Sequence, residues 1–242
     1  MNTILHTLGD ETLRLLYPPR CPVCDRLLDR GFFFCPECRK KLPVITGSRC
    51  RKCSRPLPDG EDLCPDCLER PRSFDEGLGL CSYDAVMKRI LYALKYKNRK
   101  EYGVSLGHFL AENTRDLIRL WGIDAILPVP VHKKRLRQRG YNQAEVMARV
   151  LAEETGLPLL GRAVVRQGET RAMKLLDREE RRENLRTAFA AGSESVRDRH
   201  VLILDDIYTT GATVEAIGQL LFTSGAASVS FLTVCIGGSA MI

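Results

Sequence analysis

The sequence predicts an α/β protein with a parallel sheet flanked by helices, preceded by a small cysteine-rich module. From residue 123 onward, short apolar segments that favour strands alternate with amphipathic segments that favour helices. This alternation is typical of a parallel sheet with helices on both faces. Earlier in the chain, eight of the ten cysteines lie between Cys21 and Cys67. We therefore expect a cysteine-rich module at residues 1–72 and an α/β domain at residues 73–242.

The clustered cysteines form four Cys-x-x-Cys pairs, and the gap from Cys24 to Cys35 equals the gap from Cys53 to Cys64. Four thiolates from two pairs complete the tetrahedral coordination of zinc and leave no position open for a substrate. So short a segment needs such a centre because it cannot bury a sufficient core. Sequential and interleaved pairing both fit the spacing. We predict two structural, zinc-ribbon-like sites, with the ligands Cys21, Cys24, Cys35, Cys38, Cys50, Cys53, Cys64 and Cys67.

Composition narrows the classes of protein further. No apolar run approaches the length of about 20 residues that a membrane-spanning helix needs. The first residues include Asp10 and Glu11 and lack a long apolar segment, which argues against a secretory signal and favours the cytoplasm. The formal net charge of +7 favours polyanionic partners such as nucleotides or nucleic acid. Cys81 and Cys235 lie in strand-like segments, and we expect inert, buried thiols there.

Local patterns predict the order of the remaining elements. We expect a short helix within residues 1–20, a strand at 77–83, a basic amphipathic helix at 84–97, and a second helix that includes residues 106–121. A strand at 123–130, a helix at 143–153, a strand at 163–166, a strand from 201, a helix at 214–221 and a strand at 228–236 follow. Residues 167–186 form a highly charged loop in this prediction, and residues 192–199 form a linker.

Five positive charges are concentrated in the predicted loop that follows the strand at residues 123–130. They are Lys133, Lys134, Arg135, Arg137 and Arg139. Like charges this close repel one another unless an anion is bound, so the loop is a candidate contact for phosphate groups or for the backbone of a nucleic acid. The alternative is an exposed basic loop without a ligand. Few aromatic residues lie near it in the sequence, so we do not expect extensive base stacking.

The segment Val201–Thr213 combines a strand, two acids and a hydroxyl-rich turn. Four apolar residues predict a buried parallel strand, and Asp205 and Asp206 follow at its carboxyl end. The turn that follows opens a helix, and the first N–H groups of a helix are unpaired and partially positive, so they favour phosphate. Ionised carboxylates accept hydrogen bonds from a vicinal diol. Both acids are expected at the edge of the strand, so replacing them should leave the fold intact. The residues of the turn are Thr209, Thr210, Gly211, Ala212 and Thr213.

This segment resembles the phosphoribosyl-pyrophosphate (PRPP) signature of type I phosphoribosyltransferases at all thirteen positions. The resemblance implies that Asp205 and Asp206 bind the ribose hydroxyls, that residues 209–213 bind the 5-phosphate, and that Mg²⁺ accompanies PRPP. In that family the turn after the first strand of the sheet faces pyrophosphate, which makes the basic loop a candidate contact. The charged segment at residues 167–186 would be the loop that closes over the substrate.

The whole chain resembles the ComF proteins, also called ComFC or GntX-like proteins. The resemblance implies a role in natural transformation: handling incoming single-stranded DNA in the cytoplasm with a partner helicase of the ComFA type. One position departs from the family, in which a Gln commonly follows the Thr of the charged loop, whereas Thr170 is followed here by Arg171-Ala172-Met173-Lys174. Besides the cysteine pairs and the PRPP signature, the shared motifs are Leu94-Lys95-Tyr96, Pro128-Val129-Pro130 and Arg135-Leu136-Arg137-Gln138-Arg139-Gly140-Tyr141-Asn142-Gln143.

Three functions are compatible with these motifs. The first is a PRPP-binding accessory protein that also binds DNA, with or without turnover. The second is an active phosphoribosyltransferase on an unidentified acceptor, for which the sequence offers no defined general base, although transfer from PRPP depends mainly on positioning and charge stabilisation. The third is a nucleic-acid or partner-binding module whose PRPP loop is a relic. The complete set of acids and Thr/Gly residues argues against this third function.

Overall fold

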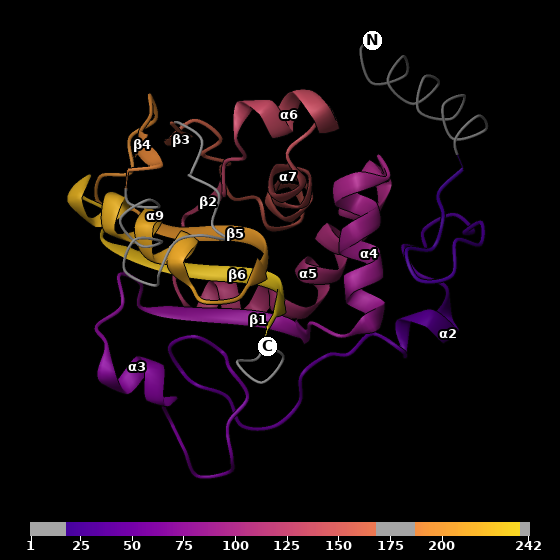
Figure 1. Cartoon of the computed structure of the whole chain (residues 1–242), viewed down its shortest axis with the longest axis horizontal. Helices are drawn as coiled ribbons and strands as arrows, with labels where there is room; N and C mark the ends of the chain where they lie inside the picture. Colours follow the sequence, from indigo (N-terminus) through magenta and orange to yellow (C-terminus); the bar gives the residue numbers. More distant parts are fainter. Residues whose placement is uncertain (1–17, 168–186, 238–242) are drawn as a thin grey trace, which may run out of the picture.

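The computed structural model describes residues 18–167 and 187–237 (Figure 1). Two short helices lie in the cysteine-rich part, α2 (Pro36–Arg39) and α3 (Pro65–Glu69). The elements that follow are β1 (Glu76–Ser82), α4 (Ala85–Tyr96), α5 (Lys100–Leu120), β2 (Ala125–Pro128), α6 (Lys133–Arg139), α7 (Gln143–Thr155), β3 (Val164–Arg166), β4 (Phe189–Ala191), β5 (His200–Tyr208), α9 (Ala212–Thr223) and β6 (Ser228–Ile236).

The main sheet has four parallel strands in the order β1-β6-β5-β2. Beyond β2, Ile126 forms an isolated parallel bridge with Leu159. Strands β3 and β4 pair antiparallel in a separate two-stranded sheet. The parallel sheet expected from the alternating pattern is therefore confirmed.

Helices cover both faces of this sheet (Figure 1). Crossovers between parallel strands are nearly always right-handed, so the direction of each step decides the face on which its helix lies. The steps from β1 to β2 and from β2 to Leu159 run in one direction, and the step from β5 to β6 runs in the other. Helices α4, α5 and α7 therefore share one face, where α5 packs on α7, and α9 lies on the opposite face. Covered faces explain why residues 201–204 are uninterruptedly apolar and buried.

The cysteine-rich part consists of two halves with the same backbone. In each half the N–H of the first cysteine, Cys21 or Cys50, donates to the carbonyl oxygen five residues later at 2.8 Å. The residue after the second cysteine has a positive φ in both halves, 60° at Asp25 and 63° at Ser54. A short helix begins directly after the third cysteine of each half. The repeat seen in the cysteine spacing is thus a repeat of structure.

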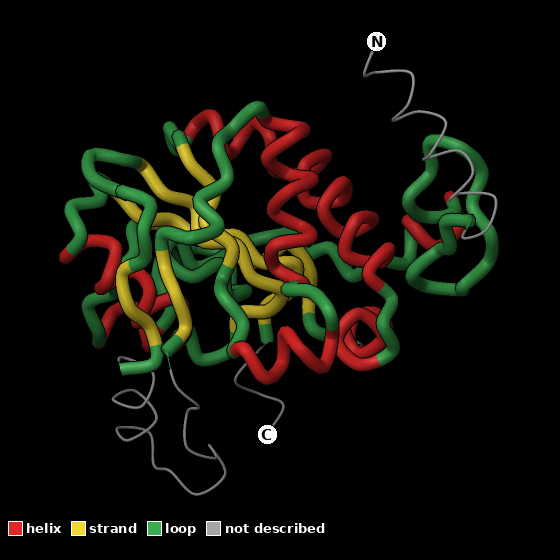
Figure 2. The backbone as a smooth tube through the Cα atoms, turned by 90° about the horizontal axis from the view of Figure 1, so that it is seen from above, coloured by secondary structure: helices red, strands yellow, loops and turns green. Residues whose placement is uncertain are grey.

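Both halves pack on the α/β part of the chain. The first lies beside α4 and α5, where the hydroxyl of Tyr102 donates to Asp25 Oδ1 at 2.9 Å, and the second lies along β1 (Figures 1 and 2). Between them, the N–H of Ile45 donates to the carbonyl of Leu80 at 3.0 Å. The buried cysteines belong to the same hydrophobic cluster as the core of the sheet. The cysteine-rich part therefore packs directly on the core of the sheet.

Most elements expected from the sequence are found within a few residues of their predicted bounds. The predicted linker at 192–199 contains no helix or strand, as expected, but β4, just before it, was missed. Two details were wrong. The basic segment at residues 133–139 is a helix, not a loop. Strand β5 continues past the four apolar residues to Tyr208, because its last residues pair with β6 as far as Ile236.

The helical state of α6 has local causes. Lys, Arg, Leu and Gln are all good helix formers. His132 caps the helix by accepting a hydrogen bond from the N–H of Lys134, and Gly140 ends it with a φ of 76°. Arg137 and Arg139 lie in its last turn, where the helix dipole favours positive charge. Charge repulsion therefore does not prevent the helix from forming.

Two predictions fall outside the described residues. These are the helix within residues 1–20, of which only residues 18–20 are described, and the charged loop at residues 167–186, of which only Gln167 is described. Among the helices that the structure describes, none is both long and apolar enough to span a bilayer.

Candidate functional site

The acid pair lies within strand β5 rather than beyond its end. The N–H of Asp206 donates to Asp205 Oδ1 at 2.8 Å. Asp205 is half-buried, whereas Asp206 is only 3% exposed. The expectation that both acids lie at the edge of the strand is therefore wrong for Asp206, and we now expect its replacement to affect the fold. Its strand is longer than the apolar run indicated.

Lys95 forms an ion pair with Asp206. Lys95 belongs to the last turn of α4, and its ammonium group contacts Asp206 Oδ2. Burial alone would lower the pKa of Lys95, but the charge and hydrogen bond of Asp206 outweigh burial, so the pKa of Lys95 is raised. A buried charge is tolerated when it is paired. The pair ties the carboxyl end of β5 to the end of α4.

Asp205 differs electrostatically from its neighbour. Burial raises the pKa of Asp205 well above its usual value of 3.8, and the negative charge of Asp206 raises this pKa further. The charge of Lys95 acts in the opposite direction and does not compensate. Two adjacent carboxylates that differ in exposure and partner can take different protonation states. A ligand that brings hydroxyl donors or a cation would favour the ionised form of Asp205.

The turn at residues 209–213 leads into a helix N-terminus. Gly211 is the N-cap of α9 with a φ of 79°, and a Cβ built there would lie 2.3 Å from the hydroxyl oxygen of Tyr208. Only glycine fits this position. Thr209 and Thr210 are exposed, and the hydroxyl oxygen of Thr210 accepts a long hydrogen bond of 3.5 Å from the N–H of Ala212, the first residue of α9. The other N–H groups of the first turn and the Thr hydroxyls form a surface suited to an anion.

The basic helix α6 presents its charges on more than one side. Arg135 and Arg139 are one helical turn apart and therefore share a face, and both line a pocket of about 310 Å³. The predicted residues Lys133, Lys134 and Arg137 do not line this pocket; all three are exposed. The five cations predicted to act together are thus divided between the pocket and the surface. The pocket lining consists of Lys95, Tyr96, Asn98, Arg135, Gln138, Arg139 and Tyr141.

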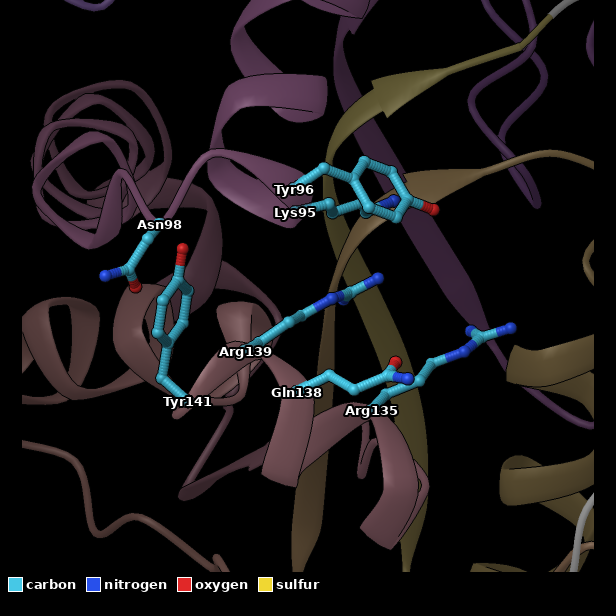
Figure 3. A pocket seen from close by; sticks show the side chains of 7 residues that line it. All are labelled: Lys95, Tyr96, Asn98, Arg135, Gln138, Arg139 and Tyr141. Carbon is cyan, nitrogen blue, oxygen red and sulfur yellow. The ribbon is translucent and has the colours of Figure 1, made fainter.

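This pocket lies between the end of α4 and helix α6 (Figure 3). Figure 3 shows Arg139 extending from α6 toward Lys95 and Tyr96. Its walls contain three cations and no acid. Tyr141 holds the two walls together, because its hydroxyl donates to the carbonyl of Leu94. The pocket is therefore preorganised for an anion, and it adjoins the acid pair through Lys95.

Arg166, at the end of β3, is a further cation near the acids. Burial lowers the pKa of Arg166, the charge of Arg135 lowers it further, and the charge of Asp205 raises it. The guanidinium carbon lies 5.3 Å from the centroid of the Phe189 ring. Strands β3 and β5 and helix α6 thus contribute charged groups to one region.

Sequence reasoning did not place Lys95, Arg166 and Tyr96 at the candidate site. Lys95 and Tyr96 were part of a motif shared with the ComF family, but that motif alone assigned no contact to them. Arg166 is the last residue of a short, mostly apolar strand, and the charged segment begins directly after it. This change from apolar to charged residues is a sequence signal for the carboxyl end of a strand. The structure also brings an aromatic side chain to the basic helix, because the guanidinium carbon of Arg139 lies 5.2 Å from the ring centroid of Tyr96.

The cysteines form two separate four-sulfur clusters. Within each cluster the four Sγ atoms lie within 4.8 Å of one another, and the distances Cys24–Cys35 and Cys53–Cys64 are 3.7 and 3.6 Å. A tetrahedron with zinc–sulfur bonds of about 2.3 Å has edges of about 3.8 Å, whereas a disulfide bond is about 2.05 Å long. The residues therefore fit zinc, and the pairing is sequential rather than interleaved. One cluster contains Cys21, Cys24, Cys35 and Cys38, and the other contains Cys50, Cys53, Cys64 and Cys67.

Comparisons with known proteins agree with this architecture. Residues 12–68 match the double zinc ribbon domain, and residues 135–240 match the phosphoribosyl transferase domain. Competence protein F of Haemophilus influenzae is 30% identical over 159 residues, which cover 64% of this chain and 69% of that protein. The chain belongs to the ComF family. The family assignment made from the motifs is thus confirmed.

Other ComF-like relatives cover most of the chain. DNA utilization protein YhgH of Salmonella typhimurium is 29% identical over 218 residues, with 89% of each chain covered. Competence protein ComFC of Bacillus subtilis is 29% identical over 207 residues, with 82% of each chain covered. A purine phosphoribosyltransferase of Pyrococcus horikoshii is a more distant structural neighbour, with a TM-score of 0.37, 14% identity, and coverage of 54% of this chain and 73% of that one. The fold assignment therefore depends on the two domain matches and the order of the strands.

Proposed function

We propose that this ComF-family protein binds PRPP together with Mg²⁺ and handles single-stranded DNA during natural transformation in the cytoplasm. One observation carries the PRPP part: the acid pair, the Thr/Gly turn and a pocket lined by cations adjoin one another around the carboxyl end of β5. The competence role belongs to the family, since relatives are named for competence and for DNA utilization.

Each part of PRPP has a chemically matched group in this proposal. Asp205 and Asp206 accept hydrogen bonds from the ribose hydroxyls, and the turn at residues 209–213 donates hydrogen bonds to the 5-phosphate. Lys95, Arg135 and Arg139 neutralise the pyrophosphate. Bound Mg²⁺ would neutralise phosphate charge, and the carboxylates of the acid pair are oxygen ligands of the kind that it accepts. Ribose binding weakens the pair between Lys95 and Asp206, which frees the ammonium for pyrophosphate.

The DNA part of the proposal depends on the surface charges of α6. Lys133, Lys134 and Arg137 lie outside the pocket and are exposed. Each cation that contacts a phosphate releases counterions, which gives affinity without sequence preference. The partner in this proposal is a helicase of the ComFA type, as the family resemblance implies.

An active phosphoribosyltransferase is the alternative function. Nothing among the described residues singles out a general base beyond the acid pair, but the cation pocket could stabilise a departing pyrophosphate. The fold alone would require Gly211 and the buried Asp206, but not the second acid or the exposed hydroxyls of Thr209 and Thr210, so the complete set argues against a relic site. The preserved geometry favours PRPP binding under either of the first two functions.

Calorimetric titration with PRPP, with and without Mg²⁺, tests the binding step. We expect binding that requires Mg²⁺. Absence of binding by the wild-type protein in the presence of Mg²⁺ would leave the relic interpretation. Incubation of the complex with a panel of bases and amines then tests turnover. Release of pyrophosphate with one acceptor would identify an enzyme, and binding without release would identify an accessory protein.

A further inference from the structure

Two tyrosines on helix α4 lie exposed beside the cation pocket. Tyr92 and Tyr96 are 54% and 66% exposed. They are one helical turn apart, with ring centroids 5.1 Å from each other and ring planes tilted by 41°. The opposite face of α4 packs Met87, Leu91 and Leu94 into the core. The tyrosines therefore contribute nothing to the buried face of this helix, and an ordinary solvent-exposed face does not require paired aromatic rings.

Positive charges flank this tyrosine pair at both ends. The guanidinium carbon of Arg139 lies 5.2 Å from the ring centroid of Tyr96, and Lys97 Nζ lies 6.0 Å from that of Tyr92. Lys88, one turn before Tyr92, is exposed as well. Helix α4 contains no acidic residue. Two neighbouring aromatic rings with cations beside them complement a ligand that has aromatic groups and a polyanionic backbone.

The pair connects directly to the basic helix. Tyr96 lines the same pocket as Arg135 and Arg139 (Figure 3). Because Tyr96 contacts α6 through Arg139, the ring lies beside the helix whose cations are proposed to hold the strand. Cations over exposed rings are held only weakly, so a base can displace Arg139 and Lys97 from the two rings.

We propose that Tyr92 and Tyr96 form a stacking platform for the bases of single-stranded nucleic acid, with α6 holding the backbone. This inference rests on the proposed DNA function and adds the bases as a second recognition element. Every base has an aromatic face, so the platform accepts all sequences. Duplex DNA, whose bases are already stacked, would not use it.

The test separates contacts to bases from contacts to phosphates. Binding is measured by fluorescence anisotropy with oligothymidylate of about 20 nucleotides and with an abasic oligomer of equal length, which keeps the phosphates and lacks the bases. We expect the wild-type protein to prefer oligothymidylate. The combined substitutions Tyr92→Leu and Tyr96→Leu should weaken the binding of oligothymidylate about tenfold or more. They should leave the affinity for the abasic oligomer unchanged. Combined Tyr92→Phe and Tyr96→Phe substitution should retain the preference, since phenylalanine stacks too.

Two controls make the outcome specific. Phe222→Leu alters a partly exposed aromatic residue on α9, across the sheet, and should bind both oligomers like the wild type. The salt dependence of the leucine variant should equal that of the wild type, because its phosphate contacts are intact. Equal binding of both oligomers by the wild type, or a leucine variant that retains the preference, would overturn the platform. A leucine variant that loses a protein partner but not DNA would overturn it too. Failure of the wild type to bind any single strand would instead overturn the proposed DNA function.

Discussion

Lys95 is the residue whose surroundings depend most on the tertiary structure. Its ammonium pairs with the buried Asp206 and also lines the cation pocket. One side chain thereby connects the group proposed to bind ribose with the groups proposed to bind pyrophosphate. The ion pair also neutralises a buried charge, so the same residue serves stability.

Replacing Lys95 by Met should destabilise the fold and weaken PRPP binding. Removal of one partner leaves the Asp206 carboxylate buried and unpaired, which costs on the order of 3 kcal/mol. Urea unfolding, followed by the fluorescence of the single tryptophan, Trp121, measures the loss in the free energy of unfolding. Lys97→Met is the matched control, because Lys97 lies two residues further on and is exposed. Equal stability of the two variants would contradict the structural role of the pair.

Replacing Asp205 by Asn should stabilise the unliganded protein and abolish its affinity for PRPP. A carboxyl whose pKa is raised on folding holds its proton more tightly in the folded state. The favourable contribution of the protonated Asp205 to the free energy of unfolding is therefore present at low pH. This contribution is lost as the pH rises from the usual pKa of 3.8 through the raised pKa. Asparagine avoids this loss and still offers an oxygen to the N–H of Asp206.

Unfolding midpoints of the wild type and of Asp205→Asn between about pH 4 and pH 8 test the shifted pKa. The advantage of the variant should grow as the pH rises. A difference between the two proteins that does not depend on pH would indicate that Asp205 has an ordinary pKa. Calorimetry with PRPP and Mg²⁺ on the same variant measures the functional loss. Asp206→Asn should also lose PRPP, but with reduced stability, because it breaks the pair with Lys95.

At the scale of elements, helix α6 divides its charges between two proposed ligands. The face of Arg135 and Arg139 borders the pocket, and the remaining cations are exposed to solvent. A loop would have left these groups free to gather around one anion. The helix fixes their spacing, and so separates a pocket face from a surface face.

Neutralising the two faces of α6 should therefore have different effects. Changing Lys133, Lys134 and Arg137 to Gln should lower the slope of log affinity for single-stranded DNA against log salt by about 0.7 for each phosphate that is no longer neutralised. Changing Arg135 and Arg139 to Gln should chiefly reduce PRPP binding. The control changes Arg119 and Arg149 to Gln, two exposed arginines on α5 and α7. An unchanged salt slope in the first variant would remove α6 from the DNA surface.

At the scale of the whole molecule, the two zinc centres act on one continuous core. Their buried cysteines share a hydrophobic cluster with the sheet, and the segment between the two halves of the cysteine-rich part is hydrogen-bonded to β1. We keep the division into residues 1–72 and 73–242 as a proposal about folding units. On that proposal, chelation unfolds residues 21–67 and leaves the α/β part largely folded, although the hydrogen bonds to β1 break.

Metal analysis of freshly purified protein should give two zinc ions per chain. Cys38→Ser and Cys67→Ser should each lose one, because each removes a ligand from a different cluster. Cys81→Ser is the control: Cys81 is buried, belongs to neither cluster, and has a pKa raised by burial to about 12. One zinc in the wild type, or disulfides in its place, would contradict the two centres.

The sequence by itself determined the features that are periodic or contiguous along the chain. The repeated cysteine spacing predicted both metal centres, and the alternation of apolar and amphipathic segments predicted the parallel sheet. The run from Val201 to Thr213 located the acids and the turn that follows them. Each of these signals is local, because period, composition and order are properties of neighbouring residues.

Only the tertiary structure decided which of these residues meet. The order of the strands brings the end of α4 to the carboxyl end of β5, so that Lys95 reaches Asp206 from a distant part of the sequence. The same arrangement sets Tyr96 against Arg139. It also buried Asp206, because β6 extends far enough to continue the pairing of β5. Such contacts depend on how strands are ordered and how far they pair, and the spacing of residues along a chain does not contain that information.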